Sequence, residues 1–269
     1  MVAIDPIIDL ALQAGELVMG MRRAGLGEIR RKSSVVDLVT EADVACERFL
    51  RSGLAALHPG VGFWGEESDT SPSEERFWVV DPIDGTNNFA AGIPYYAVNI
   101  ALQDGDATTL GVTVELPARR VYWAVAGQGA FLRETDDTVH RLQVNRVERL
   151  DYAMLSTGFP YHRADSPDNN LAEFGYFLAR SQGVRCMGTA AMDLVNVASG
   201  AQGGYWESSL KPWDAAPGAL LVREAGGLVT DYEGRPWQLR TPYLLASNGQ
   251  PALHEALLQG IQTARRGPL

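Results

Sequence analysis

Between residues 77 and 133 the sequence carries five short apolar segments, each separated from the next by residues that favour turns. The last three separating turns read Asp-Gly-Asp from residue 104, Pro-Ala-Arg-Arg from residue 117 and Gly-Gln-Gly from residue 127. Short apolar runs with such turns are typical of antiparallel strands. The sequence therefore predicts strands at residues 77–80, 96–103, 110–116, 121–126 and 130–133.

Helices are predicted before this region, and helices alternate with strands after it. Apolar residues recur at helical spacing over residues 6–24 and 40–57. From residue 140 onwards we expect strands at residues 153–156, 184–187, 204–207 and 243–246, with helices at 171–181, from 189, at 213–225 and from 251. This order predicts an α+β subdomain, residues 1–139, closely joined to an α/β subdomain, residues 140–269.

The charge and composition exclude several classes of protein. A formal charge of −10 argues against nucleic acid as a main partner, because phosphate backbones require clustered Lys and Arg. No run of 18 apolar residues is present, so no membrane span is expected. The N-terminus lacks the pattern of a signal peptide, and Cys46 and Cys186 have no metal-type spacing. We expect a cytoplasmic protein.

The predicted strand at 77–80 ends in Asp81-Pro-Ile-Asp84-Gly-Thr86, which places two carboxylates and a hydroxyl in one turn. Carboxylates at a strand end can converge on a hard cation such as magnesium, which binds one or two carboxylates together with phosphate oxygens. Alternatively, Asp81 and Asp84 only stabilise the turn. Haloacid dehalogenase-type phosphatases also use two such aspartates, but separate them by one residue rather than two.

Other acids stand beside similar signals, and each has a structural alternative. Glu66 and Glu67 follow an apolar stretch, and two interpretations stay open: metal ligands or solvated side chains. Asp43, which together with Asp37 flanks Leu-Val-Thr, fits a capping box begun by Thr40. Asp214 fits the first turn of a helix, where the helix dipole favours an acid, and Pro217 also fits a first turn.

Taken together, these segments resemble the inositol monophosphatase family. The matching blocks occur in the family's order and are residues 32–43, 65–68, 81–86, 213–216 and 224–227. One block alone is a weak signal, whereas four or more in order are specific. The resemblance implies a layered α-β-α-β-α sandwich of the sugar-phosphatase type, a homodimer, and a lithium-sensitive, magnesium-dependent phosphatase.

The resemblance also implies roles for individual residues. Glu66, Asp81 and the carbonyl of Ile83 would hold one magnesium; Asp81, Asp84 and Asp214 would hold a second; and Glu66 would contribute to a weaker third. Glu66 and Thr86 would position and deprotonate the attacking water, and Asp43 would orient the Thr86 hydroxyl. The residues implied to face the substrate are Asp84, Gly85, Thr86, Gly188, Thr189, Ala190 and Glu207.

The implied reaction is hydrolysis of myo-inositol monophosphate to inositol and phosphate, without a covalent intermediate. Relatives in the superfamily leave alternatives open: fructose 1,6-bisphosphate, histidinol phosphate, adenosine 3′,5′-bisphosphate and NADP, or a non-catalytic role in binding phosphorylated polyols. Residues 208–212 and Pro217 depart from the family pattern, and the first of these leaves the substrate in doubt. The two lysines, Lys32 and Lys211, both fall in motif-bearing segments, and we hypothesise that Lys211 attracts phosphorylated substrates.

Overall fold

The computed structural model describes residues 2–25, 29–32 and 38–267. Its largest sheet has seven strands in the order β3-β4-β5-β6-β7-β8-β9. β3 pairs with β4 in parallel, and every other neighbouring pair in this sheet is antiparallel, which confirms the predicted run of antiparallel strands. The strands are β3 (Gly62–Gly65), β4 (Arg76–Asp84), β5 (Ala97–Asp104), β6 (Ala107–Glu115), β7 (Arg120–Val125), β8 (Gly129–Arg133) and β9 (Val139–Arg141).

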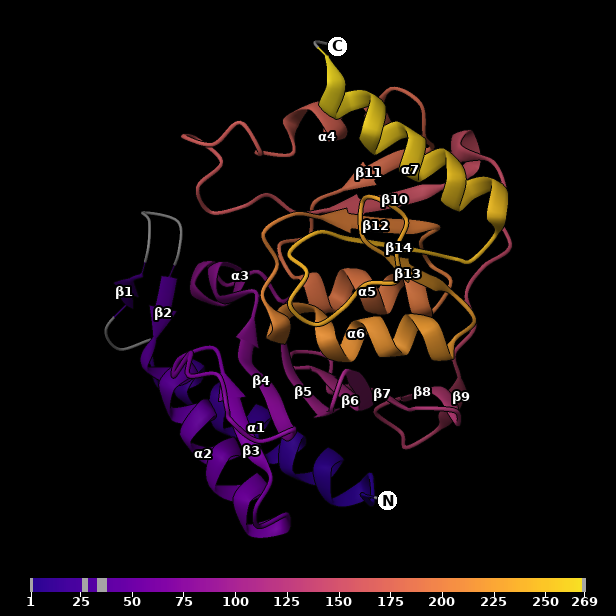
Figure 1. The fold of residues 1–269 in the computed structure, drawn as a ribbon. Coiled ribbons are helices and arrows are strands. Elements are labelled where there is room, and N and C mark those ends of the chain that lie inside the picture. The colour runs from indigo at the N-terminus through magenta and orange to yellow at the C-terminus, as the bar shows by residue number, and fades with distance from the viewer. Residues whose placement is uncertain (1, 26–28, 33–37, 268–269) are drawn as a thin grey trace.

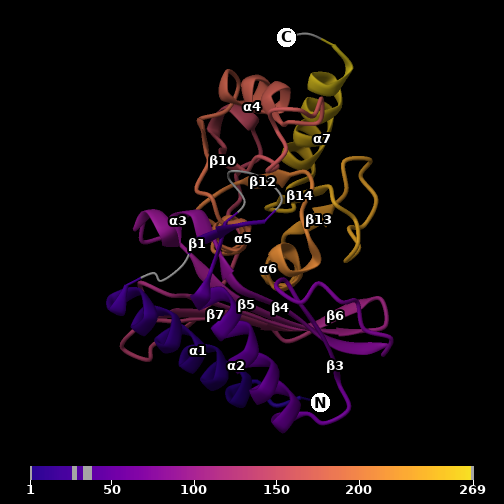
Figure 2. The same ribbon diagram turned by 90° about the vertical axis from the view of Figure 1, so that its left-hand side faces the viewer.

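Two long helices cover one face of this sheet: α1 (Asp5–Ala24) and α2 (Glu41–Leu57) (Figures 1 and 2). Their apolar stripes pack against every second residue of the strands, such as Trp78 and Val80 of β4. The alternating residues Phe77 and Val79 point to the opposite face. Successive strand residues face opposite sides, so both faces of this sheet are buried. A two-stranded sheet of β1 (Ile29–Arg31) and β2 (Leu38–Thr40) precedes α2.

The second half of the chain forms a five-stranded sheet in the order β11-β10-β12-β14-β13. β10 (Met154–Thr157) runs parallel to both β11 (Gly183–Arg185) and β12 (Gly204–Glu207). β14 (Leu244–Ser247) is antiparallel to β12 and to β13 (Leu228–Thr230). The outer face carries α4 (Leu171–Leu178) and α7 (Pro251–Arg266), with the short 3-10 helix η1 (Leu150–Tyr152) nearby.

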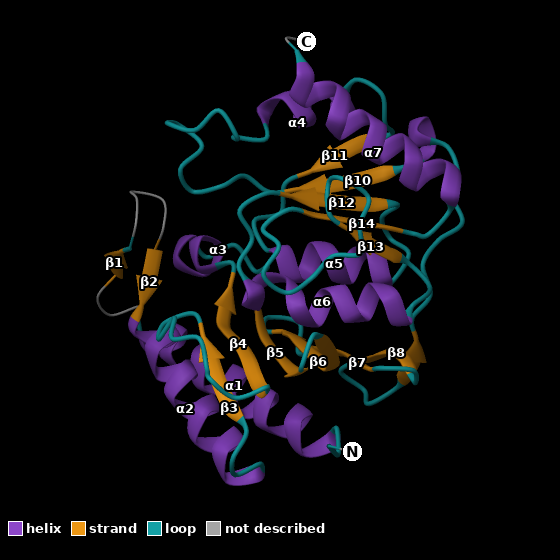
Figure 3. Ribbon diagram, in the orientation of Figure 1, coloured by secondary structure: helices purple, strands orange, loops and turns teal. Residues whose placement is uncertain are grey.

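Two helices lie between the sheets, α5 (Ala190–Ala198) and α6 (Pro212–Glu224) (Figure 3). The apolar cluster around them contains residues from both sheets, including Ala124 of β7 and Tyr205 of β12. The layers therefore run helix, sheet, helix, sheet, helix, which confirms the expected sandwich. Within the described ranges, no helix is long and apolar enough to span a bilayer.

α6 approaches the seven-stranded sheet closely at Pro217. A Cβ atom on Gly111 of β6 would lie 2.8 Å from the Pro217 Cα, so only glycine fits at this contact. The prediction that Pro217 occupies a first turn is wrong, because α6 begins at Pro212 and Pro217 lies in its interior. Proline has no amide hydrogen for the carbonyl four residues earlier. The Asn99 side chain of β5 donates to that carbonyl, Trp213, at 3.5 Å.

Candidate active site

Asp81 and Asp84 lie on β4, at a point where its pairing with β5 becomes irregular. Asp81 pairs with Asn99 and Asp84 with Ala97, so β4 gains one extra residue over this stretch. Residues three apart on a regular strand face opposite sides, but one extra residue restores the same side. The Asp81 side chain also accepts a hydrogen bond from the Ile83 amide at 3.0 Å. The Pro82-Ile83 bulge therefore turns both carboxylates toward the face that α6 covers.

Asp84 joins the two halves of the molecule. Its Oδ2 atom accepts hydrogen bonds from the Thr189 hydroxyl at 2.5 Å and the Ala191 amide at 2.6 Å. Thr189 is the N-cap of α5, so the predicted helix start is present and its first amides face this carboxylate. Burial raises the pKa of Asp84 to about 6, although the bonds to Thr189 and Ala191 act in the opposite direction.

The turn after Asp84 depends on a glycine. Gly85 has a φ of 91° and begins α3 (Thr86–Ala91). A Cβ atom there would lie 3.3 Å from the Gly188 carbonyl and from Thr189, so the segments 84–86 and 188–190 are in close contact. This contact brings together all of the predicted substrate-facing residues except Glu207, which lies on β12.

Asp43 both caps a helix and contacts the site. Its Oδ2 accepts from the Thr40 amide at 2.8 Å and the Thr40 hydroxyl at 2.6 Å, which confirms the capping box of α2. Its Oδ1 lies 3.1 Å from the Thr86 hydroxyl, which also lies 2.9 Å from the Ile83 carbonyl. Burial raises the pKa of Asp43 to about 6. Asp37, its neighbour in the sequence motif, lies outside the described residues.

Asp214 likewise begins a helix. Its Oδ2 accepts from the Lys211 amide at 2.8 Å, so the first-turn interpretation is confirmed. Burial and the charges of Asp84 and Glu66 raise the pKa of Asp214 well above its usual value. The Lys211 side chain is exposed at this end of α6.

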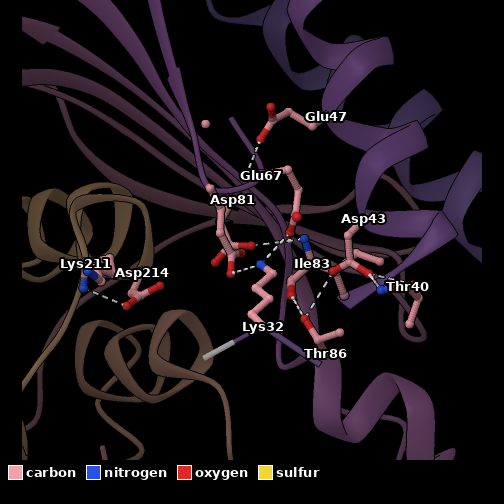
Figure 4. A network of polar contacts seen from close by, with 12 residues as sticks. Lys32, Thr40, Asp43, Glu47, Glu67, Asp81, Ile83, Thr86, Lys211 and Asp214 are labelled. Carbon is pink, nitrogen blue, oxygen red and sulfur yellow. Dashed lines mark hydrogen bonds and ion pairs between the residues drawn. The ribbon is translucent and has the colours of Figure 1, made fainter. Parts of the chain in front are cut away.

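Lys32 reaches the acids from the segment before β2. Its Nζ lies 2.8 Å from Glu66 Oε1 and 2.7 Å from Glu67 Oε1. Figure 4 shows the side chain pointing into the space between Asp81 and Glu67. Burial alone would lower the pKa of Lys32, but the Glu66 and Glu67 carboxylates raise it above its usual value. Glu47, which the sequence analysis did not single out, supports this segment by accepting from the Glu67 amide at 2.7 Å.

Four acids of this site interact through their charges. Burial, and then the negative charges of Glu66, Asp84 and Asp214, raise the pKa of Asp81 well above its usual value. Within the described parts of the chain, no three His, Cys, Asp or Glu side chains are arranged as a ready metal site. Glu66 faces Lys32, Asp84 faces α5, and Asp214 faces its own helix start. The donors are nonetheless all oxygens, and buried acids that repel one another are stabilised by a divalent cation.

Comparison with known proteins identifies the family. The model of the inositol monophosphatase family matches residues 3–266. The chain belongs to the inositol monophosphatase family. It is therefore an enzyme, a phosphoric monoester hydrolase.

Relatives in this family cover most of the chain. An inositol-1-monophosphatase of Synechocystis is 38% identical over 87% of this chain and 80% of its own length. The inositol-1-monophosphatase SuhB of Mycobacterium tuberculosis is 42% identical over 79% of this chain and 75% of its own length. The solved inositol monophosphatase from Anabaena superposes with a TM-score of 0.83 at 33% identity, covering 96% of this chain and 94% of its own.

Glu207 lies at the end of β12. Its Oε2 accepts from the Tyr205 hydroxyl at 2.5 Å. Burial raises its pKa to about 7, with a smaller contribution from the charge of Asp84. Neither Tyr205 nor Glu47 was predicted from the sequence as a site residue. Each lies at the spacing of its own element from a predicted site residue: Tyr205 two residues before Glu207 on a strand, and Glu47 four residues after Asp43 on a helix.

Proposed function

We propose that this enzyme hydrolyses myo-inositol monophosphate to inositol and phosphate in a magnesium-dependent reaction without a covalent intermediate. The observation that carries the proposal is the electrostatic coupling of Glu66, Asp81, Asp84 and Asp214, which come from β4, α6 and the segment after β3. Two of these acids are about 130 residues apart in the sequence and have no counter-ion in common among the described residues. A shared cation accounts for their proximity.

The residues that would hold magnesium are those that the family resemblance implies. Glu66, Asp81 and the Ile83 carbonyl would form one site, Asp81, Asp84 and Asp214 a second, and Glu66 would take part in a weaker third. Bound at these positions, magnesium would lower the pKa of a water molecule and neutralise the phosphoryl oxygens. Lithium inhibition belongs to the same proposal.

The protein's own groups would then orient the attacking water. Glu66 would accept its proton, because this carboxylate is partly exposed. Thr86 would hold the water through its hydroxyl. Asp43 keeps that hydroxyl in place at 3.1 Å, and its own position is set by the cap of α2.

The substrate would lie between the carboxylates and α5. The start of α5 favours an anion through the helix dipole, and the Ala191 and Met192 amides there already donate to Asp84 and Thr189. Glu207 would accept hydrogen bonds from the polyol hydroxyls, since an ionised carboxylate can accept from two neighbouring hydroxyls. Relatives named inositol-1-monophosphatase support this substrate class. We extend the proposal to a cytoplasmic homodimer.

Phosphate release from a panel of substrates tests the proposal. Inositol 1-phosphate, fructose 1,6-bisphosphate, histidinol phosphate, adenosine 3′,5′-bisphosphate, NADP and p-nitrophenyl phosphate would be assayed with magnesium, with EDTA and with lithium. We expect the highest kcat/KM for inositol 1-phosphate, no turnover in EDTA and recovery on adding magnesium. Unchanged turnover in EDTA would exclude the metal mechanism. A clear preference for a bisphosphate would show that inositol 1-phosphate is not the preferred substrate.

A further inference from the structure

Asp193 is a buried acid that none of the roles above uses. It lies on α5, one helical turn after Thr189, and only 1% of its surface is exposed. Its Oδ1 atom is buried and has no hydrogen-bond partner among the described residues. An unpaired buried polar atom costs about 1–3 kcal/mol, so it calls for an explanation.

The side chains around Asp193 come from the sheet that α5 covers. Ser156 of β10 and Tyr205 of β12 are register partners, so both point to the same face. Glu207 lies two residues after Tyr205 and shares that face. Tyr205 packs in the same apolar cluster as Leu194 and Val195 of α5, which places this face against α5.

The hydroxyl groups near Asp193 already have acceptors. Ser156 donates to Gln202 Oε1 at 2.5 Å, and Tyr205 donates to Glu207 Oε2 at 2.5 Å. Ser156 also lies within hydrogen-bonding reach of Asp193, but a hydroxyl has one hydrogen to donate, so neither hydroxyl supplies a hydrogen to Asp193 in this arrangement. The Tyr205 bond also leaves the second oxygen of Glu207 available.

The charges around Asp193 indicate its protonation state. Burial, followed by the negative charge of Glu207, raises the pKa of Asp193 well above its usual value, and Asp84 has a smaller effect. A raised pKa favours the protonated form of this carboxyl group. It then becomes a hydrogen-bond donor, and Glu207 is the charged group that affects it most.

We propose that Asp193 is a positioning residue for Glu207: as a neutral carboxylic acid it donates to a bridging water, which in turn donates to the free oxygen of Glu207. Tyr205 and this bridge would fix the two oxygens of Glu207 in the orientation that reads substrate hydroxyls. A water with partners on Asp193, Glu207 and Ser156 has the two to four contacts that buried waters make. The proposal rests on the proposed function, because Glu207 is taken as the residue that reads the polyol.

The test compares two substrates across a set of variants. The readout is the ratio of kcat/KM for inositol 1-phosphate to that for p-nitrophenyl phosphate, which has no hydroxyls to read. Asp193→Ala should lower this ratio about tenfold, as loss of a hydrogen bond to a charged group does. Asp193→Asn retains a donor and should keep the ratio within about threefold of the parent. The double variant Asp193→Ala/Glu207→Gln should lose no more than the worse single variant.

Asp231→Asn is the matched control, because Asp231 is a buried acid whose hydrogen bonds come from its own turn at residues 233–235. It should lower stability without changing the ratio. Equal losses on both substrates in Asp193→Ala, additive losses in the double variant, or an Asn variant as impaired as the Ala variant would each overturn the proposal.

A measurement without substrate separates this proposal from the proposed function. If the parent enzyme hydrolyses p-nitrophenyl phosphate but no polyol phosphate, the substrate class is wrong, and the ratio carries no information about Asp193. Urea unfolding in EDTA then decides. Coupling between Asp193 and Glu207 predicts that the midpoint of the double variant equals that of one single variant. If the midpoint of the double variant is lowered by the sum of the two single-variant shifts, Asp193 and Glu207 are not coupled.

Discussion

Asp43 and Asp214 each use one carboxylate oxygen to cap a helix. In Asp43 the second oxygen faces Thr86, so this residue both caps α2 and contacts the site. In Asp214 the cap occupies Oδ2 and leaves Oδ1 for a ligand. The sequence could not distinguish a helix cap from a site residue, because an acid at the third helical position can act as either. The helix cap is what orients the carboxylate toward the site.

At Asp84 and Asp214, we expect the change to Asn to lower turnover by about a thousandfold or more in each variant. Asn keeps an oxygen that can accept the existing hydrogen bonds but removes the charge that would hold magnesium. Steady-state kinetics on inositol 1-phosphate measure the loss, and circular dichroism controls for folding. A loss below about tenfold in either variant would remove that residue from the metal site.

Glu207→Gln tests the residue proposed to read the polyol. Gln keeps the shape but weakens the acceptor, so kcat/KM for inositol 1-phosphate should fall about ten- to thirtyfold. Hydrolysis of p-nitrophenyl phosphate should change little. If both substrates lose equally, Glu207 serves the metals or the fold instead.

At the scale of single elements, the contact between α6 and β6 sets the position of Asp214. Gly111→Ala should cost about 1–3 kcal/mol of unfolding free energy, because its Cβ would meet the Pro217 backbone. Gly20→Ala in α1 is the control. Its Cβ would lie 3.9 Å from the Arg23 guanidinium, so this substitution should be neutral or stabilising. Urea unfolding measures the free energy of both variants. Equal changes in Gly111→Ala and Gly20→Ala would contradict a tight contact between Gly111 and Pro217.

The start of α2 should give stability an unusual pH dependence. The pKa of Asp43 is about 6 in the folded protein, against an ordinary value of 3.8. The folded state therefore binds a proton that the unfolded state releases between about pH 4 and 6, so stability falls as pH rises through this window.

We expect Asp43→Asn to remove this contribution. The unfolding free energy of the parent relative to the variant should fall by roughly 3 kcal/mol between pH 4 and pH 7, as an upper value for a shift of about two units. Urea unfolding in EDTA at several pH values measures the difference. A difference that stays constant with pH would show that the Asp43 carboxylate titrates normally.

Much of the fold was predictable from the sequence, because long strands and amphipathic helices carry a clear period. β1, β2, β9 and β13 were missed because three residues are too few to show alternation. The main acids were predictable because they occur in motifs. Lys32 could be noted only as a residue near a motif, since its contact with Glu66 depends on how distant segments fold together. No role could be assigned to Asp193 from the sequence, because a buried acid on a helix resembles any other helical acid in sequence.

For the whole molecule, the shared middle layer predicts one cooperative unfolding transition. We propose that residues 1–139 and 140–269 are subdomains, but α5 and α6 complete the cores of both. The six tryptophans are divided evenly between the halves: Trp64, Trp78, Trp123, Trp206, Trp213 and Trp237. Fluorine NMR of 5-fluorotryptophan protein should give the same urea midpoint for all six signals. Two groups of midpoints, one for each half, would show that the subdomains unfold independently.

The order of the layers along the chain also matters while the protein is being synthesised. The seven-stranded sheet is complete at residue 141, whereas α6, which covers one of its faces, ends at residue 224. At about 5–20 residues per second, a ribosome needs about 4–17 s for those 83 residues. During that time α1 and α2 are available to cover one face, but Val79 and Ala101 on the other face await Trp213 and Ala216. The nascent first half therefore exposes an apolar sheet surface until the second half emerges.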